Sequence, residues 1–536
     1  MNNRSHLFIP ATTFVVAFCS IIYELVFAQT LTTVFGGTVL RYSATIGLFL
    51  MSLGAGAFLY EYIKDKVHTQ RFFFYTELLL TFFGFMGVFF IVYLNGPLGE
   101  ALPYWILLTL SHLPIILIGV LSGLELPLLT EFEAGKRFAR VLGIDYIGSL
   151  AGSFVFALLL YPNFGLLTTS IIIALLNAFV AILFAIQYKL YSRKRLVLQA
   201  LALAVFTTGV YFTYQKAEQV IQKLYFTGMI ERGYETLSVP VASLEILDSI
   251  TTPYQDVVVY KINFEHPELV PSDVCLNLDE HVQMCNSWVG AYHNGLVDVP
   301  LSFFPKEKKL SILILGGGDF IATNNLRSYD DRILHIDLVD LDAKFQQYAR
   351  TEPYLLEKNN RAFEYEKQSL FVEDAFYFLK RNKKSYDLIL VDLPGLRHDK
   401  MLPLYSTEFY SFARSALADD GMLVSWRYPK EIFPAHSDVL ERTLEASGFK
   451  NMLEYYAWNS LPDGSEQTTE KFFVVGKGSE RNIHTEDNEY VSQFKDKYEN
   501  LSWRPLSYKT GVRENSVFKP NYDMLIVGPG SPEKQL

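Results

Sequence analysis

The chain has 536 residues, of which 50% are hydrophobic and 15% aromatic, and it carries a net charge of −10 at pH 7. A mean hydropathy of +0.16 is too high for a wholly soluble protein of this length, and the acidic balance argues against nucleic acid as a partner. Three cysteines are too few for a disulfide scaffold.

The hydrophobic residues are concentrated before about residue 215, in runs long enough to cross a bilayer. We therefore expect a transmembrane helical domain over residues 1–215, with the lipid bilayer as a partner. The first run is of full length and no small-residue cleavage site follows it, so a removed signal peptide is not expected. About seven spans are predicted, near Leu7–Ala28, Leu40–Tyr60, Phe72–Leu94, Leu102–Leu124, Val141–Tyr161, Leu166–Tyr188 and Leu196–Tyr214.

Basic residues fall in alternate loops between these runs, and the positive-inside tendency places such loops in the cytosol. They are Lys64, Lys66, Arg71, Lys136, Arg137, Arg140, Lys189, Arg193, Lys194 and Arg195. With seven spans the C-terminal half would lie outside, away from a cytosolic nucleotide-type ligand. We nevertheless expect a multi-pass protein of the cell inner membrane with a cytoplasmic soluble domain, and the conflict with the charge pattern stays open.

Three acidic residues, Glu24, Glu125 and Asp145, lie within the apolar runs. An ionised side chain is costly in hydrocarbon and usually faces a protein interior. One interpretation is a cavity that holds a cation. The favoured interpretation is that these residues lie near span ends and pair with lysine or arginine of the loops.

Residues 237–300 alternate between apolar and polar side chains and predict a small β-strand module of hairpins. Its expected strands are Leu244–Leu247, Asp256–Ile262, Val274–Leu278 and His281–Cys285. Cys275 and Cys285 flank one hairpin and could face each other, and a bond between them would imply an oxidising compartment. Two buried free thiols are the favoured interpretation.

Residues 301–478 alternate between apolar strands and helices, which predicts an α/β domain with a parallel sheet and crossover helices. The expected strands are Leu310–Leu315, Leu334–Leu341, Tyr386–Val391, Met422–Trp426, Leu453–Trp458 and Phe472–Val475. The expected helices are Ala343–Arg350, Ala375–Lys380, Thr407–Leu417 and Ser437–Ser447, the last capped by Gly448. Residues 479–536 form a C-terminal extension in which Trp503–Tyr508 is a candidate edge strand.

The segment LSILILGGGDF, Leu310–Phe320, combines a buried strand with a glycine loop of the kind that approaches a nucleotide closely. Asp340 lies about twenty residues further on, at the distance where a carboxylate can bind a ribose. Acids follow successive strand ends: Asp319, Asp340, Asp342, Asp374 and Asp392. Any one of them could be a helix cap. Together they predict a crevice for a positively charged ligand that carries ribose and amino groups.

These residues resemble the polyamine aminopropyltransferases (the spermidine synthase family), and specifically a membrane-bound bacterial branch. The resemblance covers about Tyr254–Lys477, and IYE (Ile22–Glu24) in the first half is also similar. It rests on TPYQDVVVY (Thr252–Tyr260), LNLDEHVQ (Leu276–Gln283), Tyr292-His293, GGGDF, LVDLD (Leu338–Asp342), EDA (Glu373–Ala375), YDLILVDLPG and LYSTEFY (Leu404–Tyr410).

The resemblance implies a methyltransferase-like, Rossmann-type fold that binds decarboxylated S-adenosylmethionine as a co-substrate, with no permanently bound cofactor and no metal. The implied donor-binding residues are Gln255, Gly316, Gly317, Gly318, Asp319, Asp340, Asp374 and Ala375. The implied acceptor-binding residues are Gln283, His293 and Tyr405, and the candidate catalytic residues are Asp392, Asp399 and Tyr292. The implied partners are a small amine and a sulfonium nucleoside, and a homo-oligomer is left open.

Several acids that the family carries on the acceptor side are replaced in this chain. Gly395 stands where the family has the aspartate thought to take the proton of the amine, and Asn294 stands where it has a glutamate. Trp288 and Val289 replace an acidic pair, and Phe320 replaces a glycine. Three functions therefore stay open. The first is an aminopropyltransferase, the second a sensor or binding module coupled to a polyamine-handling membrane domain, and the third an S-adenosylmethionine methyltransferase.

Overall fold

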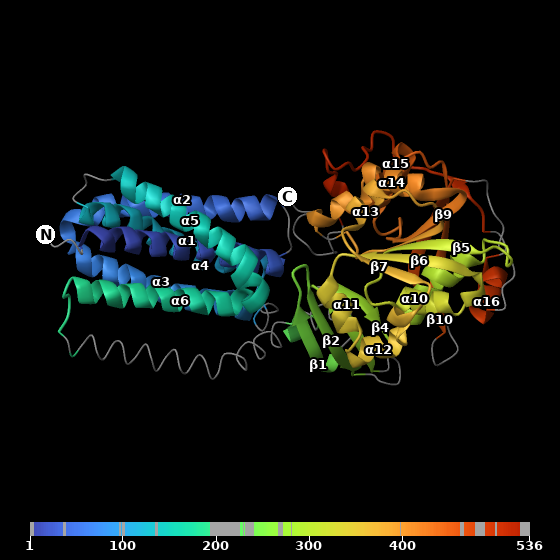
Figure 1. Ribbon diagram of the computed structural model, residues 1–536, viewed down its shortest axis with the longest axis horizontal. Coiled ribbons are helices and arrows are strands. Elements are labelled where there is room, and N and C mark those ends of the chain that lie inside the picture. Colours follow the sequence, from blue (N-terminus) through green and yellow to red (C-terminus); the bar gives the residue numbers. More distant parts are fainter. Residues whose placement is uncertain are drawn as a thin grey trace. The chain divides into compact units, whose positions relative to one another are not determined.

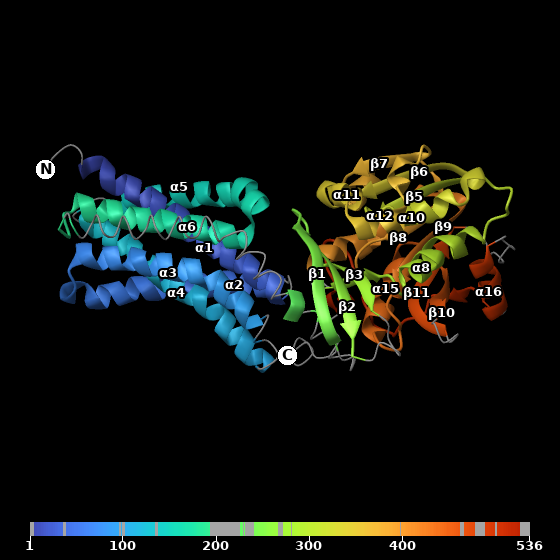
Figure 2. The ribbon, with the colours of Figure 1, turned by 90° about the horizontal axis from the view of Figure 1, so that it is seen from below.

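The computed structural model describes residues 5–35, 39–95, 98, 102–133, 138–192, 194, 226–228, 230, 241–265, 272–279, 281–396, 398–460, 466–477, 488–498 and 501–525. The chain divides into two compact units, Met1–Val241 and Ala242–Leu536. The first is built of long helices, and the second combines sheets with shorter helices (Figures 1 and 2). The finer division of the second unit at residues 300 and 478 stays a prediction.

Long apolar helices lie side by side in the first unit (Figure 1). They are α1 (Ser5–Phe35), α2 (Val39–Ile63), α3 (Thr69–Asn95), α4 (Tyr104–Phe132), α5 (Phe138–Val155) and α6 (Tyr161–Gln187). A π-helical turn, Phe156–Leu160, joins α5 to α6, and the chain bends at Gly165, where φ is +68°. Helix α5 packs mainly on α1, whereas α6 packs mainly on α3 and also on α1.

Five stretches of this unit are long and apolar enough to cross a membrane, and the last of them, Phe138–Gln187, contains both α5 and α6. Pro114 and Pro127 lie inside the continuous helix α4. The predicted span Leu196–Tyr214 lies outside the described residues. The predicted number of seven spans is therefore not confirmed.

Glu125 lies in the interior of the helical unit, with only 4% of its surface exposed. It lies near the carboxyl group of Glu77, which is fully buried and has no hydrogen-bond partner among the described residues. Loop residues such as Lys136 and Arg137 lie outside the described residues, so the favoured pairing of Glu125 with a loop lysine or arginine stays a prediction.

The second unit begins with a four-stranded antiparallel sheet in the order β1-β2-β3-β4. Its strands are β1 (Val241–Thr251), β2 (Asp256–Phe264), β3 (Asp273–Leu278) and β4 (His281–Cys285). Val257 and Leu276 of this sheet share a buried core with Leu310 and Phe345 of the α/β part. The small sheet is therefore packed as part of the second unit.

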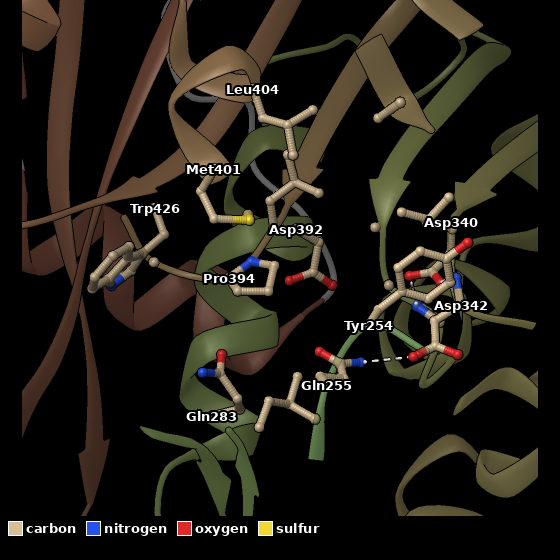
Figure 3. Close-up of a pocket in the computed structure, with 18 of the residues that line it drawn as sticks. Tyr254, Gln255, Gln283, Asp340, Asp342, Asp392, Pro394, Met401, Leu404 and Trp426 are labelled. Carbon is tan, nitrogen blue, oxygen red and sulfur yellow. Dashed lines mark hydrogen bonds between the residues drawn. The ribbon is translucent and has the colours of Figure 1, made fainter. Parts of the chain in front are cut away.

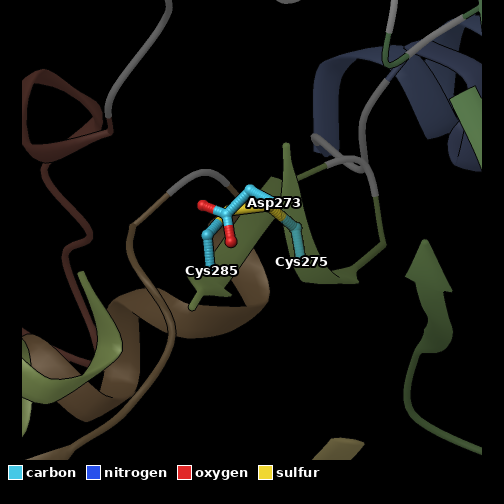
Figure 4. A group of neighbouring side chains, drawn as sticks. All are labelled: Asp273, Cys275 and Cys285. Carbon is cyan, nitrogen blue, oxygen red and sulfur yellow. A yellow bond between two sulfur atoms is a disulfide. The ribbon is translucent and has the colours of Figure 1, made fainter. Parts of the chain in front are cut away.

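Cys275 and Cys285 form a disulfide, because the two residues lie opposite each other on β3 and β4 with their Cα atoms 4.0 Å apart. The favoured expectation of two free thiols is wrong. Asp273 lies beside the pair (Figure 4). Disulfide sulfur atoms are not thiolates, so this group of three does not offer the ligands of a metal site.

An eight-stranded sheet in the order β12-β10-β11-β9-β8-β5-β6-β7 forms the centre of the second unit. Five neighbouring strands are parallel: β5 (Leu310–Gly316), β6 (Ile333–Asp340), β7 (Gln368–Val372), β8 (Tyr386–Asp392) and β9 (Leu417–Arg427). The other three are antiparallel: β10 (Asn451–Ser460), β11 (Glu466–Gly476) and β12 (Arg504–Pro505). The sheet is thus mixed rather than wholly parallel as predicted, and β12 confirms the expected edge strand.

Helices cover both faces of this sheet. One core joins Ile312 and Ile314 of β5 to α10 (Ile321–Arg327), α11 (Ala343–Ala349), α12 (Pro353–Asn359) and α16 (Glu489–Lys497). The other joins Leu313 and Leu315 to α13 (Ala375–Arg381), α14 (Thr407–Ala416) and α15 (Pro434–Ala446). Alternate residues of β5 thus face opposite cores, which explains why the strand reads as a continuous apolar run.

Candidate active site

A cavity of about 740 Å³ lies at the carboxyl ends of β5, β6 and β8. Its described lining contains seven carboxylates, one lysine and two histidines: Asp279, Asp319, Asp340, Asp342, Asp374, Asp392, Glu470, Lys400, His293 and His398. In Figure 3, Gln255, Asp340 and Asp342 lie on one side of Asp392, and Trp426, Met401 and Pro394 lie on the other. The excess of acids suits a positively charged ligand.

The glycine loop after β5 forms the floor of this cavity. Gly316 and Gly317 have φ angles of +89° and +71°, a region that side chains with a Cβ rarely adopt. A Cβ at Gly316 would lie 1.9 Å from the backbone oxygen of Asp392, and one at Gly318 would lie 2.8 Å from the carboxylate of Asp340. The predicted glycines are therefore needed for the close approach of β5 to its two neighbours.

Asp340 ends β6 and is fixed by the backbone. Its Oδ1 accepts from the N–H of Asp342 at 2.8 Å, and its Oδ2 accepts from the N–H of Gly318 at 3.2 Å. Burial raises the pKa of Asp340, and the hydrogen bonds from the Asp342 N–H and the Gln346 side chain oppose the rise. The neighbouring Asp342 caps α11 and also accepts from Gln255 Nε2 at 3.3 Å (Figure 3). This contact joins the small sheet to the side of the cavity that contains Asp340.

Asp374 and Ala375 also line the cavity, as predicted from the strand ends. Asp374 caps α13, since its side chain accepts from the N–H groups of Phe376 and Tyr377. Asp342 and Asp374 are therefore both helix caps, the alternative considered for a single aspartate, and both also line the cavity.

Asp392 ends β8 and lies at the middle of the cavity. Tyr292 donates its hydroxyl hydrogen to Asp392 Oδ1 at 2.8 Å, whereas the buried Oδ2 has no partner among the described residues. Burial raises the pKa of Asp392, and the bond from Tyr292 opposes this rise. The free Oδ2 can therefore accept a hydrogen bond or a proton from a ligand.

His293, Asp319 and Asp392 bring three possible ligand atoms within 4.8 Å of one another. His293 Nδ1 lies 2.8 Å from the backbone oxygen of Val289, and its buried Nε2 has no partner among the described residues. Burial, and then the charge of Asp392, raise the pKa of Asp319 to about 6. One histidine and two carboxylates could hold a metal cation, and they equally suit an organic ammonium or sulfonium group.

The cavity has no room for an acid at position 395. A Cβ there would lie 2.5 Å from the hydroxyl oxygen of Tyr428. The Tyr428 ring is itself packed by Trp426, with ring centroids 4.3 Å apart, and by Phe433 and His436. The side chain of Asn294 contacts Asp298 and Asn325 and does not line the cavity.

Glu470 is a lining carboxylate that the sequence did not reveal. It lies on β11, half-buried, and Trp426 Nε1 donates to its Oε2. Burial raises its pKa to about 7. The other acids were predicted because they follow the ends of parallel strands. Glu470 instead lies on the antiparallel strand β11, so that pattern does not identify it.

The other predicted site residues divide into two groups. Gln255, Gln283, Tyr292 and His293 line the cavity. Asp399 and Tyr405 do not, and Tyr405 instead donates its hydroxyl hydrogen to the backbone oxygen of Pro394 at 3.0 Å. Tyr405 thus supports the loop that carries Gly395 rather than facing the cavity.

Comparisons with known proteins agree on one family. A model of the spermine/spermidine synthase domain matches residues 290–478. A polyamine aminopropyltransferase 2 from Aquifex aeolicus (strain VF5) is 30% identical over 456 residues, which cover 81% of this chain and 82% of the relative. A polyamine aminopropyltransferase from Oceanobacillus iheyensis is 30% identical over 444 residues, 80% of each chain. A crystal structure of the spermidine synthase from Thermotoga maritima is 21% identical, with a TM-score of 0.35, covering 49% of this chain and 80% of that one.

Proposed function

Because this chain belongs to the polyamine aminopropyltransferase family, we propose that it moves an aminopropyl group from decarboxylated S-adenosylmethionine to an amine acceptor such as putrescine. The by-product is methylthioadenosine. The observation that carries the proposal for this chain is the cavity lined by seven carboxylates at the ends of its parallel strands. The donor is a sulfonium and the acceptor is an ammonium in water. Both substrates are therefore cations, which the negatively charged lining of the cavity attracts.

The donor side is assigned to the residues around the glycine loop. We assign the ribose hydroxyls to Asp340, whose carboxylate is already oriented by two backbone N–H groups. Asp374 at the start of α13 is assigned to the adenine amino group. Gln255 and Asp319 are assigned to the aminopropyl end of the donor, which brings the reacting carbon toward Asp392.

The reaction requires that the amine and the aminopropyl carbon be positioned next to each other, and that one proton be transferred. The nitrogen lone pair of the neutral amine forms a bond to the aminopropyl carbon next to the sulfonium. The C–S bond breaks, and its electron pair stays on sulfur as the thioether. The extra proton on the new secondary amine goes to Asp392 Oδ2, which has no other partner among the described residues. Tyr292 holds the second oxygen of Asp392 and fixes the direction of the first.

A binding module without catalysis is the second candidate, and one observation favours it. The position where the family carries the proton-accepting aspartate is closed by Tyr428 in this chain. Two nearby residues, Asp399 and His398, are candidates to replace that aspartate, and of these His398 lines the cavity whereas Asp399 does not. The methyltransferase alternative is less favoured, because Gln255 and Gln283 reach the cavity from the small antiparallel sheet, a module that ordinary methyltransferases lack.

The test incubates detergent-purified full chain with the decarboxylated donor and a panel of diamines, and measures methylthioadenosine release. We expect release that depends on the amine. Saturable donor binding with no release for any amine would support the binding module instead. Methyl transfer from intact S-adenosylmethionine would support the methyltransferase.

We propose that the first unit anchors the enzyme in the cell membrane as a multi-pass protein. Its five long apolar stretches support this placement. The Cys275–Cys285 bond supports an oxidising compartment for the second unit. This observation opposes the cytoplasmic placement expected from the donor.

A further inference from the structure

Glu470 differs from most lining carboxylates in how it is held. Asp319, Asp340, Asp342 and Asp374 each accept a hydrogen bond from backbone N–H groups near the strand ends. Asp279 lies 3.7 Å from the ammonium of Lys400. Among the described lining acids, only Glu470 and Asp392 accept a single bond from a neutral side chain, Trp426 and Tyr292 respectively. These two carboxylates therefore remain available to a cationic ligand.

Both carboxylates lie near Tyr292, which donates a hydrogen bond to Asp392. Strands β11 and β9 are antiparallel, with Phe472 opposite Trp426 and Lys471 opposite Arg427. Continuing this register by one residue places Glu470 opposite Tyr428. Glu470 and Phe472 point to the same face of the strand, and the Phe472 ring lies 5.4 Å from the Tyr292 ring between centroids. The charges of both Asp392 and Glu470 add to the rise in the pKa of Tyr292 that burial causes.

The wall around Glu470 is aromatic. Trp288, Tyr292, Trp426 and Tyr428 line this part of the cavity together with it. Aromatic faces pack well against methylene groups and attract an ammonium ion, and a single carboxylate fixes where that ion binds. Such a wall suits an alkyl chain that ends in a charged amino group.

We propose that Glu470 binds the second, unreactive ammonium group of the acceptor, which makes the acceptor a diamine or longer polyamine rather than a monoamine. This inference rests on the proposed aminopropyl transfer. Asp392 receives the proton from the amine that reacts, and Glu470 holds the other end of the same molecule. Glu470 thereby takes the part of the glutamate that this chain lacks at position 294.

The test compares the wild-type full chain with Glu470→Gln at pH 8, using a diamine and the monoamine of equal carbon number. We expect the KM for the diamine to rise about 10- to 100-fold, because a hydrogen bond between charged groups is lost, while kcat changes much less. The preference for diamine over monoamine, as the ratio of the two kcat/KM values, should fall at least about tenfold. Glu470→Asp should restore part of that preference. Glu357→Gln, a change of an exposed glutamate outside the cavity, is the matched control and should leave both values unchanged.

An unchanged preference in Glu470→Gln, with the wild type active, overturns this inference and leaves the proposed function intact. Wild-type protein that releases no methylthioadenosine with any amine overturns both. If Glu470→Gln does not fold, Trp426→Phe provides the second test, since it removes the N–H that orients Glu470 and keeps an aromatic ring. An unchanged KM for the diamine in that variant also overturns the inference.

Discussion

Asp340 is the residue whose loss should affect donor binding most. We expect Asp340→Ala to weaken the affinity for the sulfonium donor at least about 100-fold, because each hydrogen bond to a charged group contributes about 1.5–3 kcal/mol. Calorimetric titration of the full chain in detergent measures this. Asp419→Ala, at the exposed far end of β9, is the control and should bind normally. Wild-type affinity in Asp340→Ala would remove the ribose assignment.

Tyr292 should control the pH dependence through Asp392. Its hydroxyl bond lowers the pKa of Asp392, so Tyr292→Phe should raise that pKa. At a given acidic pH, less Asp392 is then ionised and able to take a proton. The acidic limb of the kcat/KM profile should therefore move to higher pH, with maximal activity approached only in more alkaline buffer. A limb that stays in place, or moves to lower pH, would show that Asp392 is not the proton acceptor.

At the scale of elements, Tyr428, the residue after β9, leaves little space beside Gly395. Gly395→Ala should lower the melting temperature, because the new Cβ meets the Tyr428 hydroxyl at 2.5 Å, and overpacking costs about 1–3 kcal/mol. Adding Tyr428→Phe removes that oxygen, and the nearest remaining ring atom lies 3.4 Å away. The double variant should regain most of the lost stability.

Gly290→Ala provides the matched control for this thermal measurement, since a Cβ at Gly290 meets nothing within 4 Å. It should melt like the wild type. Equal melting temperatures for Gly395→Ala and Gly290→Ala would mean that Tyr428 does not fill position 395.

The disulfide between β3 and β4 makes a separate prediction. Cys275 and Cys285 should resist alkylation in protein isolated from native membranes until a reductant is added. Replacing both by serine should lower the free energy of unfolding by about 2–3 kcal/mol, given the short loop of 10 residues that the bond closes. Alkylation without reductant would show that the two thiols are free, and it would support the cytoplasmic placement expected from the sequence.

Much of the α/β part could be predicted because strands such as β5 and β8 are buried on both faces and therefore read as unbroken apolar runs. The edge strand β7 was missed, since its residues are only half-buried. The antiparallel direction of β10 and β11 carries no pattern of its own in the sequence. The short helix α10, which follows Phe320 at a φ of +66°, was missed as well.

The convergence of acids beside the glycine loop was predictable for a similar reason. The carboxyl ends of parallel strands meet at one edge, so Asp319, Asp340 and Asp392 had to converge. Glu470 and Tyr428 could not be anticipated, because their position depends on how β9 and β11 pair, far from the glycine loop in sequence. The sequence showed that position 395 carries a glycine in place of an acid. It did not show that the Tyr428 side chain lies beside this position.

At the scale of the whole molecule, the main feature of both the chain and its cavity is negative charge. The chain as a whole is acidic, and the lining of its cavity concentrates seven carboxylates against one lysine. Such a site should prefer cations, and added salt should weaken that preference. The first unit, with its five long apolar stretches, means that measurements belong on the full chain in detergent or lipid.

The most direct test is a calorimetric comparison of decarboxylated S-adenosylmethionine with methylthioadenosine on the full chain. Only the first carries the charged sulfur and the ammonium of the aminopropyl arm. We expect the sulfonium compound to bind at least about tenfold more tightly, which corresponds to about 1.4 kcal/mol. Equal affinities, or no heat with either compound, would contradict a cavity whose acids recognise a positively charged nucleoside.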